Sequence, residues 1–224
     1  VQVDLYGGAQ LGTTAEVLEG MYAGVADVMC ESIGTLATFT PLANIEAMPY
    51  MFSSYDHFMN VWYSDLGQEI KDAVGDDAGF KLMGASYRGP RVVCATKELK
   101  TIADFKGFKL RAPNLEMYLK TWQWAGANPT PVPMNEVYTA LQTKTCDAME
   151  IAAGVGIYSK FYEVCDNYTD INWQFMSQGF LLSDKCWNSL PDDLRQIVVD
   201  CAWESSEFEY EKEKEFAAEA MDQL

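Results

Sequence analysis

The sequence has very little of the chemistry on which most enzymes depend. It contains one histidine, His57, in the segment YDHFMNVW, where we expect it to be exposed on a helix. Serine and cysteine nucleophiles need a neighbouring base. The sequence also contains no GxSxG, GxxxxGK[ST] or HExxH motif, and no GxGxxG after a strand. We therefore expect no catalytic residue and no cofactor, and we do not expect an enzyme.

Cysteine spacings typical of metal sites are missing as well. None of the six cysteines forms a CxxC pair, and with a single histidine available no zinc site is expected. The even number of cysteines permits disulfides, but most of them lie in apolar strand or helix contexts and can equally be buried thiols. The cysteines therefore leave both their pairing and the compartment open.

Basic residues and long apolar runs are scarce. The sequence has 16 Lys and Arg against 33 Asp and Glu, a net charge of −17, which repels nucleic acid phosphates and anionic membrane surfaces. No apolar run approaches the roughly 18 residues that a membrane-spanning helix needs. We therefore expect no nucleic acid partner and no direct membrane insertion. The acids crowded between Glu204 and Glu219 are explained by a solvated helix face.

What the sequence does contain is typical of a folded α/β protein. Its 224 residues are 49% hydrophobic and 13% aromatic, enough to build a sizeable core. Apolar periodicity and turn residues predict strand, helix, strand, helix, strand in residues 1–86, with a half-buried strand at 1–6 and one helix over 54–75. This alternation favours a mainly parallel sheet. A second set of strands and helices follows, and a long helix begins near Pro191.

These two α/β units predict two lobes. No Gly/Ser/Pro-rich linker separates them, so we expect the chain to cross from lobe to lobe in strands and to leave a ligand cleft between them. Residues 1–88 and 177–224 are assigned to lobe one and residues 89–176 to lobe two. The sequence opens in mid-strand and stops in mid-helix, so we expect a piece cut at both ends. The absent signal peptide is then no evidence for the cytoplasm.

The stretch FKGFKLRAPN, residues 105–114, carries a candidate anion-binding residue. Arg111 stands at the end of a predicted strand, immediately before the Ala-Pro dipeptide. The planar guanidinium fits a carboxylate bidentately and cannot be discharged. At a strand end that faces a cleft, it would hold an anion. The alternative explanation is an ordinary surface or intramolecular ion pair.

The run TIADFKGFKLRAPN, followed by AGANPTPVPMNEVYTALQTKTCDAME and KFYEVCDNYT, resembles the solute-binding subunit of tripartite ATP-independent periplasmic (TRAP) transporters. EVLEGMYAGVADVM, the PYMF of MPYMFSSYDH and WNSLPDDLRQIVVDCAWES extend the resemblance over essentially the whole chain. The resemblance implies a two-lobed α/β fold like that of periplasmic binding proteins, with crossing strands and a long C-terminal helix. The lobes would close on a small organic acid, which the protein would deliver to a membrane permease.

The resemblance also implies a set of ligand-binding residues. In such proteins the arginine of the K-x-R-x-P element holds the ligand carboxylate, a second arginine after the first crossover assists, and the asparagine of R-x-P-N adds a hydrogen bond or caps a helix. These residues are Arg111, Arg91 and Asn114. The family commonly has an aromatic residue where this chain has Met134, and an asparagine where it has Ile151. These two differences leave the ligand open and suggest a less polar far end or a different polar contact.

Three further residues complete the candidate site. Trp173 is expected either to line the cleft or to belong to the core. Glu31 and Glu46 are expected near the rim of lobe one, where they would accept a hydrogen bond from a hydroxyl or amine of the ligand.

The resemblance implies a periplasmic or extracytoplasmic, monomeric solute-binding protein of a TRAP transporter. The permease subunits would be its protein partners. Two alternatives remain open at this point: a ligand-binding sensor domain, and an α/β enzyme acting on an organic acid.

Overall fold

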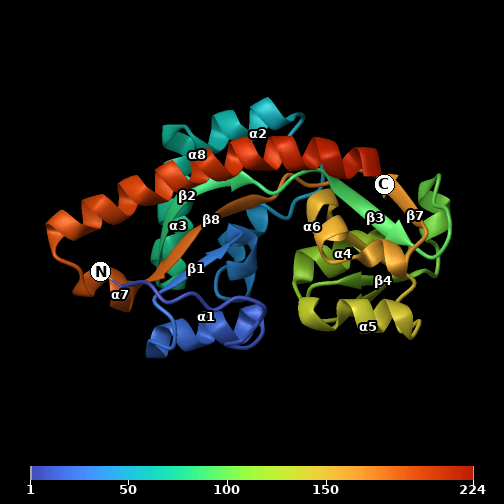
Figure 1. The fold of residues 1–224 in the computed structure, drawn as a ribbon, viewed down its shortest axis with the longest axis horizontal. Helices are drawn as coiled ribbons and strands as arrows, with labels where there is room; N and C mark the ends of the chain where they lie inside the picture. Colours follow the sequence, from blue (N-terminus) through green and yellow to red (C-terminus); the bar gives the residue numbers. More distant parts are fainter. Residues whose placement is uncertain (1, 224) are drawn as a thin grey trace.

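The chain forms two β-sheets, each with its own helices. The computed structural model describes residues 2–223. One sheet has three strands in the order β1-β8-β2, and the other has five in the order β5-β4-β6-β3-β7. Figure 1 shows the two sheets side by side, with the helix α8 crossing above both. We call the elements around the three-stranded sheet lobe one and those around the five-stranded sheet lobe two.

Lobe one is assembled from both ends of the described chain. Its strands are β1 (Val28–Glu31), β2 (Phe80–Tyr87) and β8 (Ser177–Ser183). Its helices and 3-10 turns are α1 (Thr14–Ala23), η1 (Ile33–Thr38), η2 (Pro41–Ile45), α2 (Tyr55–Trp62), α3 (Asp65–Ala78) and α7 (Asp184–Ser189). The main core of this lobe is built around Phe58, Trp62 and Leu181, which are almost fully buried.

Lobe two is formed by a continuous segment. Its strands are β3 (Arg91–Ala95), β4 (Lys109–Ala112), β5 (Asn128–Pro131), β6 (Ala148–Ala152) and β7 (Asn167–Asp170). Its helices and turns are η3 (Ile102–Phe105), α4 (Glu116–Trp124), η4 (Met134–Glu136), α5 (Val137–Gln142), α6 (Ala153–Tyr158) and η5 (Phe161–Glu163). Separate cores contain Leu110 and Trp122 on one face of the sheet and Met149 and Val137 on the other. The residue boundaries assigned to the lobes stay a prediction.

The prediction of a mainly parallel sheet is wrong. In lobe one, β8 pairs antiparallel with both β1 and β2. In lobe two, β3 pairs antiparallel with β6 and β7, and only the β4–β5 and β4–β6 pairs are parallel. The strands that break the pattern, β3, β7 and β8, adjoin the segments that cross between the lobes. Hydrophobic periodicity reports which residues of a strand are buried, but not the direction of the neighbouring strand.

Two local predictions also fail. Residues 2–6 form no strand, and Leu5 is 90% exposed, because no neighbouring strand of the described chain pairs with them. The helix expected over 54–75 is two helices, since Ser64 caps α3 by accepting a hydrogen bond from the Gly67 backbone amide. A serine side chain competes for backbone hydrogen bonds and therefore favours a helix start.

Two crossings and one long helix connect the lobes. The chain passes from β2 to β3 through residues 88–90 and returns from β7 to β8 through residues 171–176. Helix α8 (Asp192–Gln223) packs on β2 in lobe one and on α6 in lobe two. Among the described residues, no helix combines the length and apolar character of a membrane span.

Helix α8 approaches β2 closely where the strand is irregular. The register of β2 against β8 shifts between Met83 and Ser86, and Gly84 lies there with φ of +69°. A Cβ atom at Gly84 would lie 2.9 Å from the carbonyl oxygen of Ala202 in α8 and would overlap Ser206 Oγ. Glycine is required at this position both for its backbone conformation and for the close approach of the helix.

We therefore expect Gly84→Ala to destabilise the protein more than Gly107→Ala does. Both glycines have positive φ, +69° and +74°, but a Cβ at Gly107 would meet nothing within 4 Å. Each alanine incurs the left-handed backbone cost of about 1–2 kcal/mol. Only the Gly84 variant adds overpacking, which costs about 1–3 kcal/mol. Urea denaturation of both variants measures the difference, and equal losses would show that the α8 contact does not constrain this strand.

Candidate functional site

Five strand ends of lobe two meet at one edge of its sheet. The parallel strands β4, β5 and β6 all end there, at Ala112, Pro131 and Ala152. Strand β3 is antiparallel to β6 and so begins there, with Arg91 opposite Ala152. Strand β7 is antiparallel to β3 and ends there at Asp170. The six lobe-two residues predicted for the site therefore lie at or just beyond this edge: Arg91, Arg111, Asn114, Met134, Ile151 and Trp173.

Arg111 is buried at this edge without an acidic partner. Its side chain is 6% exposed, and its Nε donates a 2.8 Å hydrogen bond to the carbonyl oxygen of Val132. Burial lowers the pKa of Arg111, since it disfavours the charged form. The chain's other three arginines each form an ion pair, in the pairs Arg88–Glu31, Arg91–Glu150 and Arg195–Asp192. Within the described chain, Arg111 is the one arginine with no carboxylate at salt-bridge distance.

Arg91 has a different environment from Arg111. Its Nε donates a 2.9 Å hydrogen bond to Glu150 Oε2, and its Nη2 donates to the same oxygen. The indole Nε1 of Trp173 donates a third hydrogen bond to that oxygen at 3.1 Å. Burial disfavours the charged form of Arg91, but the attraction and hydrogen bonding of Glu150 and the nearby hydroxyls of Tyr118 and Tyr87 together outweigh it, and the net effect raises the pKa of Arg91. Arg91, Glu150 and Trp173 thus form one buried and mutually bonded group.

The two arginines also lie on different faces of the sheet. Arg111 is the register partner of Met149, whereas Glu150 is the register partner of Val93, two residues after Arg91. Because side chains alternate along a strand, Arg111 and Ile151 share one face while Arg91 and Glu150 share the other. The predicted joint action of both arginines on one ligand group stays a prediction, since each has its own partner here.

The neutral candidates differ in accessibility. Asn114 is exposed, and α4 has its N-cap at Leu115 with no side-chain cap hydrogen bond, so the predicted capping role of Asn114 is wrong. Met134 opens η4 and is 38% exposed, whereas Ile151 is 7% exposed. Trp173 is 2% exposed and packs edge-to-face on Tyr118 and Trp122, so it belongs to the core and reaches the site through Glu150.

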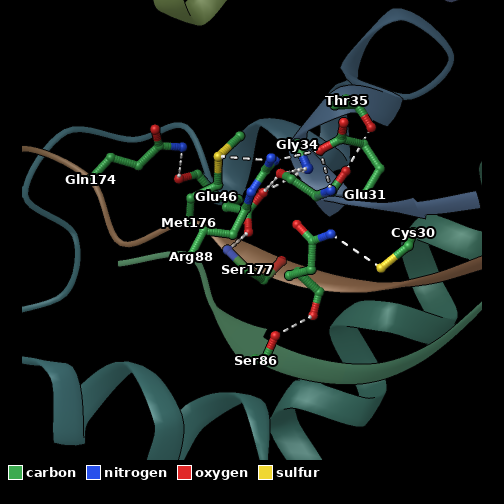
Figure 2. A network of polar contacts seen from close by, with 12 residues as sticks. Cys30, Glu31, Gly34, Thr35, Glu46, Ser86, Arg88, Gln174, Met176 and Ser177 are labelled. Carbon is green, nitrogen blue, oxygen red and sulfur yellow. Dashed lines mark hydrogen bonds and ion pairs between the residues drawn. The ribbon is translucent and has the colours of Figure 1, made fainter. Parts of the chain in front are cut away.

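On the lobe-one side, the two predicted glutamates are already engaged. Glu31 ends β1, and its Oε1 accepts a hydrogen bond from Arg88 Nη1. Glu46 is 1% exposed, so the prediction that it lies at a rim is wrong. Its carboxylate accepts hydrogen bonds from the backbone amides of Gly34 and Ser177 and from the Ser32 hydroxyl (Figure 2). Burial raises the pKa of Glu46. This carboxylate holds η1 to the start of β8.

Sequence reasoning missed the residues that join the two lobes here. Gln174 Nε2 donates a 3.0 Å hydrogen bond to the carbonyl oxygen of Glu46 in lobe one, and the Tyr118 hydroxyl in α4 of lobe two donates to Gln174 Oε1 at 2.9 Å. Glu150, which is hydrogen-bonded to Arg91, was not among the residues predicted for the site. The partners of Gln174 lie 128 and 56 residues away, and no local pattern indicates contacts over such separations.

The described residues contain no group of three or more His, Cys, Asp or Glu side chains that could hold a metal ion. All six cysteines are free thiols, and three of them, Cys94, Cys146 and Cys165, are buried. Burial raises the pKa of Cys165 to about 12, which makes its thiolate scarce at neutral pH. His57 is exposed. What the edge offers chemically is therefore hydrogen bonding and charge at Arg111.

Glu150→Ala is expected to destabilise the protein by about 3–5 kcal/mol, because it leaves the Arg91 guanidinium buried and unpaired. The double variant Arg91→Met/Glu150→Leu should recover most of that loss, since it removes both charges. Glu116→Ala is the control: its pair with Lys120 is 74% and 66% exposed and should change stability by less than about 1 kcal/mol. Chemical denaturation compares the variants. Equal losses for Glu150→Ala and Glu116→Ala would mean that the buried pair contributes no more than a surface one.

The sequence of this chain matches the model of a known protein family. The model described as "Bacterial extracellular solute-binding protein, family 7" matches residues 1–224. Among curated proteins, the sialic acid-binding periplasmic protein SiaP of Vibrio cholerae is 31% identical over 88% of this chain. The match covers 62% of the Vibrio protein, so the chain spans less than two thirds of that relative's length.

Solved structures match over nearly the whole of this chain. A TRAP periplasmic solute-binding protein from Xanthobacter autotrophicus, with bound β-D-galacturonate, aligns with a TM-score of 0.95 at 23% identity over 100% of this chain and 74% of its own. Another from Roseobacter denitrificans, with bound L-galactonate, aligns with a TM-score of 0.90 at 26% identity over 96% of this chain and 71% of its own. The two-lobed fold with crossings and a long C-terminal helix is the fold of these proteins.

Proposed function

Since the chain belongs to the bacterial extracellular solute-binding protein family 7, we propose that it captures a small organic acid outside the cytoplasm for a TRAP transporter. Arg111 supplies the charge that binds the ligand carboxylate, and the permease subunits of the transporter receive the ligand. The binding protein acts as a monomer. Lobe one comprises residues 1–88 and 177–224 and lobe two residues 89–176, and the lobes close on the acid by bending at the two crossings.

The observation that carries this proposal is that Arg111 is buried with no carboxylate of the described residues at salt-bridge distance. A buried guanidinium normally has an acidic partner, and this chain has 33 acids for its 16 bases. The Val132 carbonyl oxygen fixes Nε and leaves the terminal nitrogens for a bidentate contact with a carboxylate. Charge-assisted hydrogen bonds of this kind contribute roughly 1.5–3 kcal/mol net. Because the net charge of −17 repels anions at long range, selectivity has to come from this local contact.

The ligand is proposed to carry one carboxylate and a hydroxylated, uncharged remainder. A dicarboxylate would need a second free cation, but Arg91 and Arg88 are already paired with Glu150 and Glu31. Asn114 and Met134 are exposed beyond the same sheet edge and are proposed to contact the remainder, next to the apolar side chain of Ile151. The sugar acids bound by the Vibrio and Roseobacter relatives, sialic acid and L-galactonate, belong to this chemical class.

The alternatives predict different observations. An α/β enzyme would convert a bound acid, whereas a binding protein releases it unchanged. A sensor domain would bind the same acid but would be joined to a signalling or membrane segment in the complete protein. The family membership favours transport over both.

A thermal-shift screen tests the ligand class. L-galactonate, D-galacturonate and N-acetylneuraminate are expected to raise the melting temperature, because a ligand that binds only the folded state stabilises it. Succinate, with its second charge unpaired, should raise it much less. A larger shift with succinate than with every sugar acid would contradict the single-carboxylate proposal.

Arg111→Ala should weaken binding of the best acid at least about tenfold, and Arg111→Lys should restore only part of it, because an ammonium cannot form the planar two-bond contact. Arg195→Ala, at an arginine on α8 paired with Asp192, is the control and should bind as the unmodified protein does. Isothermal titration calorimetry measures all three. Undiminished affinity in a folded Arg111→Ala protein would refute the role of Arg111.

A further inference from the structure

A pocket lies away from the sheet edge that carries Arg111. It has a volume of about 380 Å³ and lies between α2, the end of β2 and α8. Its lining residues are Tyr55, Asp56, Tyr87, Tyr210, Glu213 and Lys214. Pockets of roughly 300–1,000 Å³ are the size that small ligands use. Figure 1 shows α2 alongside α8. We call this site the α2–α8 pocket.

Tyrosine rings form much of the wall of the α2–α8 pocket. Tyr55 and Tyr210 stack with ring centroids 5.3 Å apart, and Tyr87 lies 5.2 Å from Tyr55. The chain's own ammonium group demonstrates what these rings attract, since Lys214 Nζ lies 4.7 Å from the Tyr210 ring centroid. The electron-rich face of an aromatic ring favours cations.

Two buried oxygen atoms of this lining have no hydrogen-bond partner in the described chain. They are Glu213 Oε1 and the Tyr55 hydroxyl oxygen. Buried polar atoms without partners are rare and costly, so a hydrogen-bond donor bound in the pocket would be stabilised by these groups. Burial also raises the pKa of Glu213 to about 7, although the nearby Arg88 acts in the opposite direction.

The surrounding charges favour a positive occupant over an anion. Asp56 adds an exposed carboxylate at the pocket, and Glu209, one turn before Glu213, further raises the pKa of Glu213. A metal ion fits less well than an organic cation, because no cluster of three metal-binding side chains occurs in the described residues. Aromatic walls and a hydrogen-bond acceptor together suit an alkylammonium group.

We propose that the α2–α8 pocket binds a primary alkylammonium compound, with the ammonium group donating to the Glu213 carboxylate and to the Tyr55 hydroxyl while its alkyl chain packs on the tyrosine rings. This site is chemically opposite to Arg111, which suits an anion. The inference does not depend on the proposed function, because it uses none of the residues assigned to the acid.

The probe is 1,4-diaminobutane, titrated calorimetrically into the protein at about pH 8 and moderate salt, where surface charge interactions are screened. We expect saturable binding at one site. Tetramethylammonium, a cation with no N–H group, should bind more weakly, since it can contact the rings but cannot donate to Glu213. Binding that never saturates would overturn the proposal, as would tetramethylammonium binding at least as tightly as the diamine.

Two variants that remove the same charge from α8 localise the site. Glu213→Gln should weaken 1,4-diaminobutane binding at least about tenfold, whereas Glu204→Gln, at an exposed α8 position outside the pocket lining, should change it less than about twofold. Equal effects of the two variants would mean unspecific attraction to the acidic helix and would overturn the proposal. Tyr55→Phe provides a second test that keeps the packing, and it should weaken binding at least about threefold. Unchanged affinity in that variant contradicts the hydroxyl contact.

The pH dependence gives a further readout. The titratable and charged groups around Glu213 are Tyr55 and Asp56 from α2, Tyr87 and Arg88 from the end of β2, and Glu209, Tyr210 and Lys214 from α8. With the pKa of Glu213 raised to about 7, its carboxyl group is largely protonated at about pH 6 and ionised at about pH 8. Affinity for the diamine should therefore rise through this interval in the unmodified protein and stay flatter in Glu213→Gln. An identical profile in both proteins would contradict the role of Glu213.

Discussion

A buried guanidinium without an acidic partner is the constraint on which the candidate site depends. Taking a charge out of water is unfavourable unless it is paired, and the other three arginines of this chain follow that rule. Arg111 is held by one neutral carbonyl oxygen, that of Val132. In a chain with twice as many acids as bases, no carboxylate of the described residues lies within salt-bridge distance of Arg111. This environment is the basis for the proposal that Arg111 binds one anionic group at the sheet edge.

The surrounding polar groups keep that edge in place. Glu150 joins Arg91 on β3 to Trp173 in the returning crossing. Glu46 and Gln174 then connect the same crossing to both lobes. Each of these groups has its hydrogen-bond partners within the chain, whereas Arg111 has no carboxylate at salt-bridge distance and is therefore the residue proposed to contact the ligand. Candidate ligand residues and fold-supporting residues thus lie within a few positions of one another and differ only in whether their partner is part of the chain.

Helix α8 contributes an acidic, tyrosine-lined pocket, whose chemistry differs from that of the sheet edge at Arg111. Its packing against Gly84 brings it down onto lobe one, while its later turns reach α6 of lobe two. Along this course it places Tyr210 and Glu213 beside α2 and the end of β2. Acidic residues that in the sequence suggested only a solvated face therefore include one carboxylate that is partly buried among tyrosines. Its environment favours a cation, in contrast to the anion favoured at Arg111.

The sequence by itself determined the two α/β units and the long final helix, because helix caps and apolar periodicity are local signals. It also singled out Arg111 as the candidate anion-binding residue, because an arginine at the end of a strand is a local signal too. It did not determine strand direction, the break at Ser64 or the exposed course of residues 2–6, since these depend on which segments become neighbours. Only the tertiary structure decided which charged side chains form ion pairs within the chain and which do not. Arg91 and Arg111 look alike in the sequence, but Glu150, 59 residues from Arg91, forms hydrogen bonds with Arg91 and stays beyond salt-bridge distance of Arg111, because the fold decides which arginine it contacts.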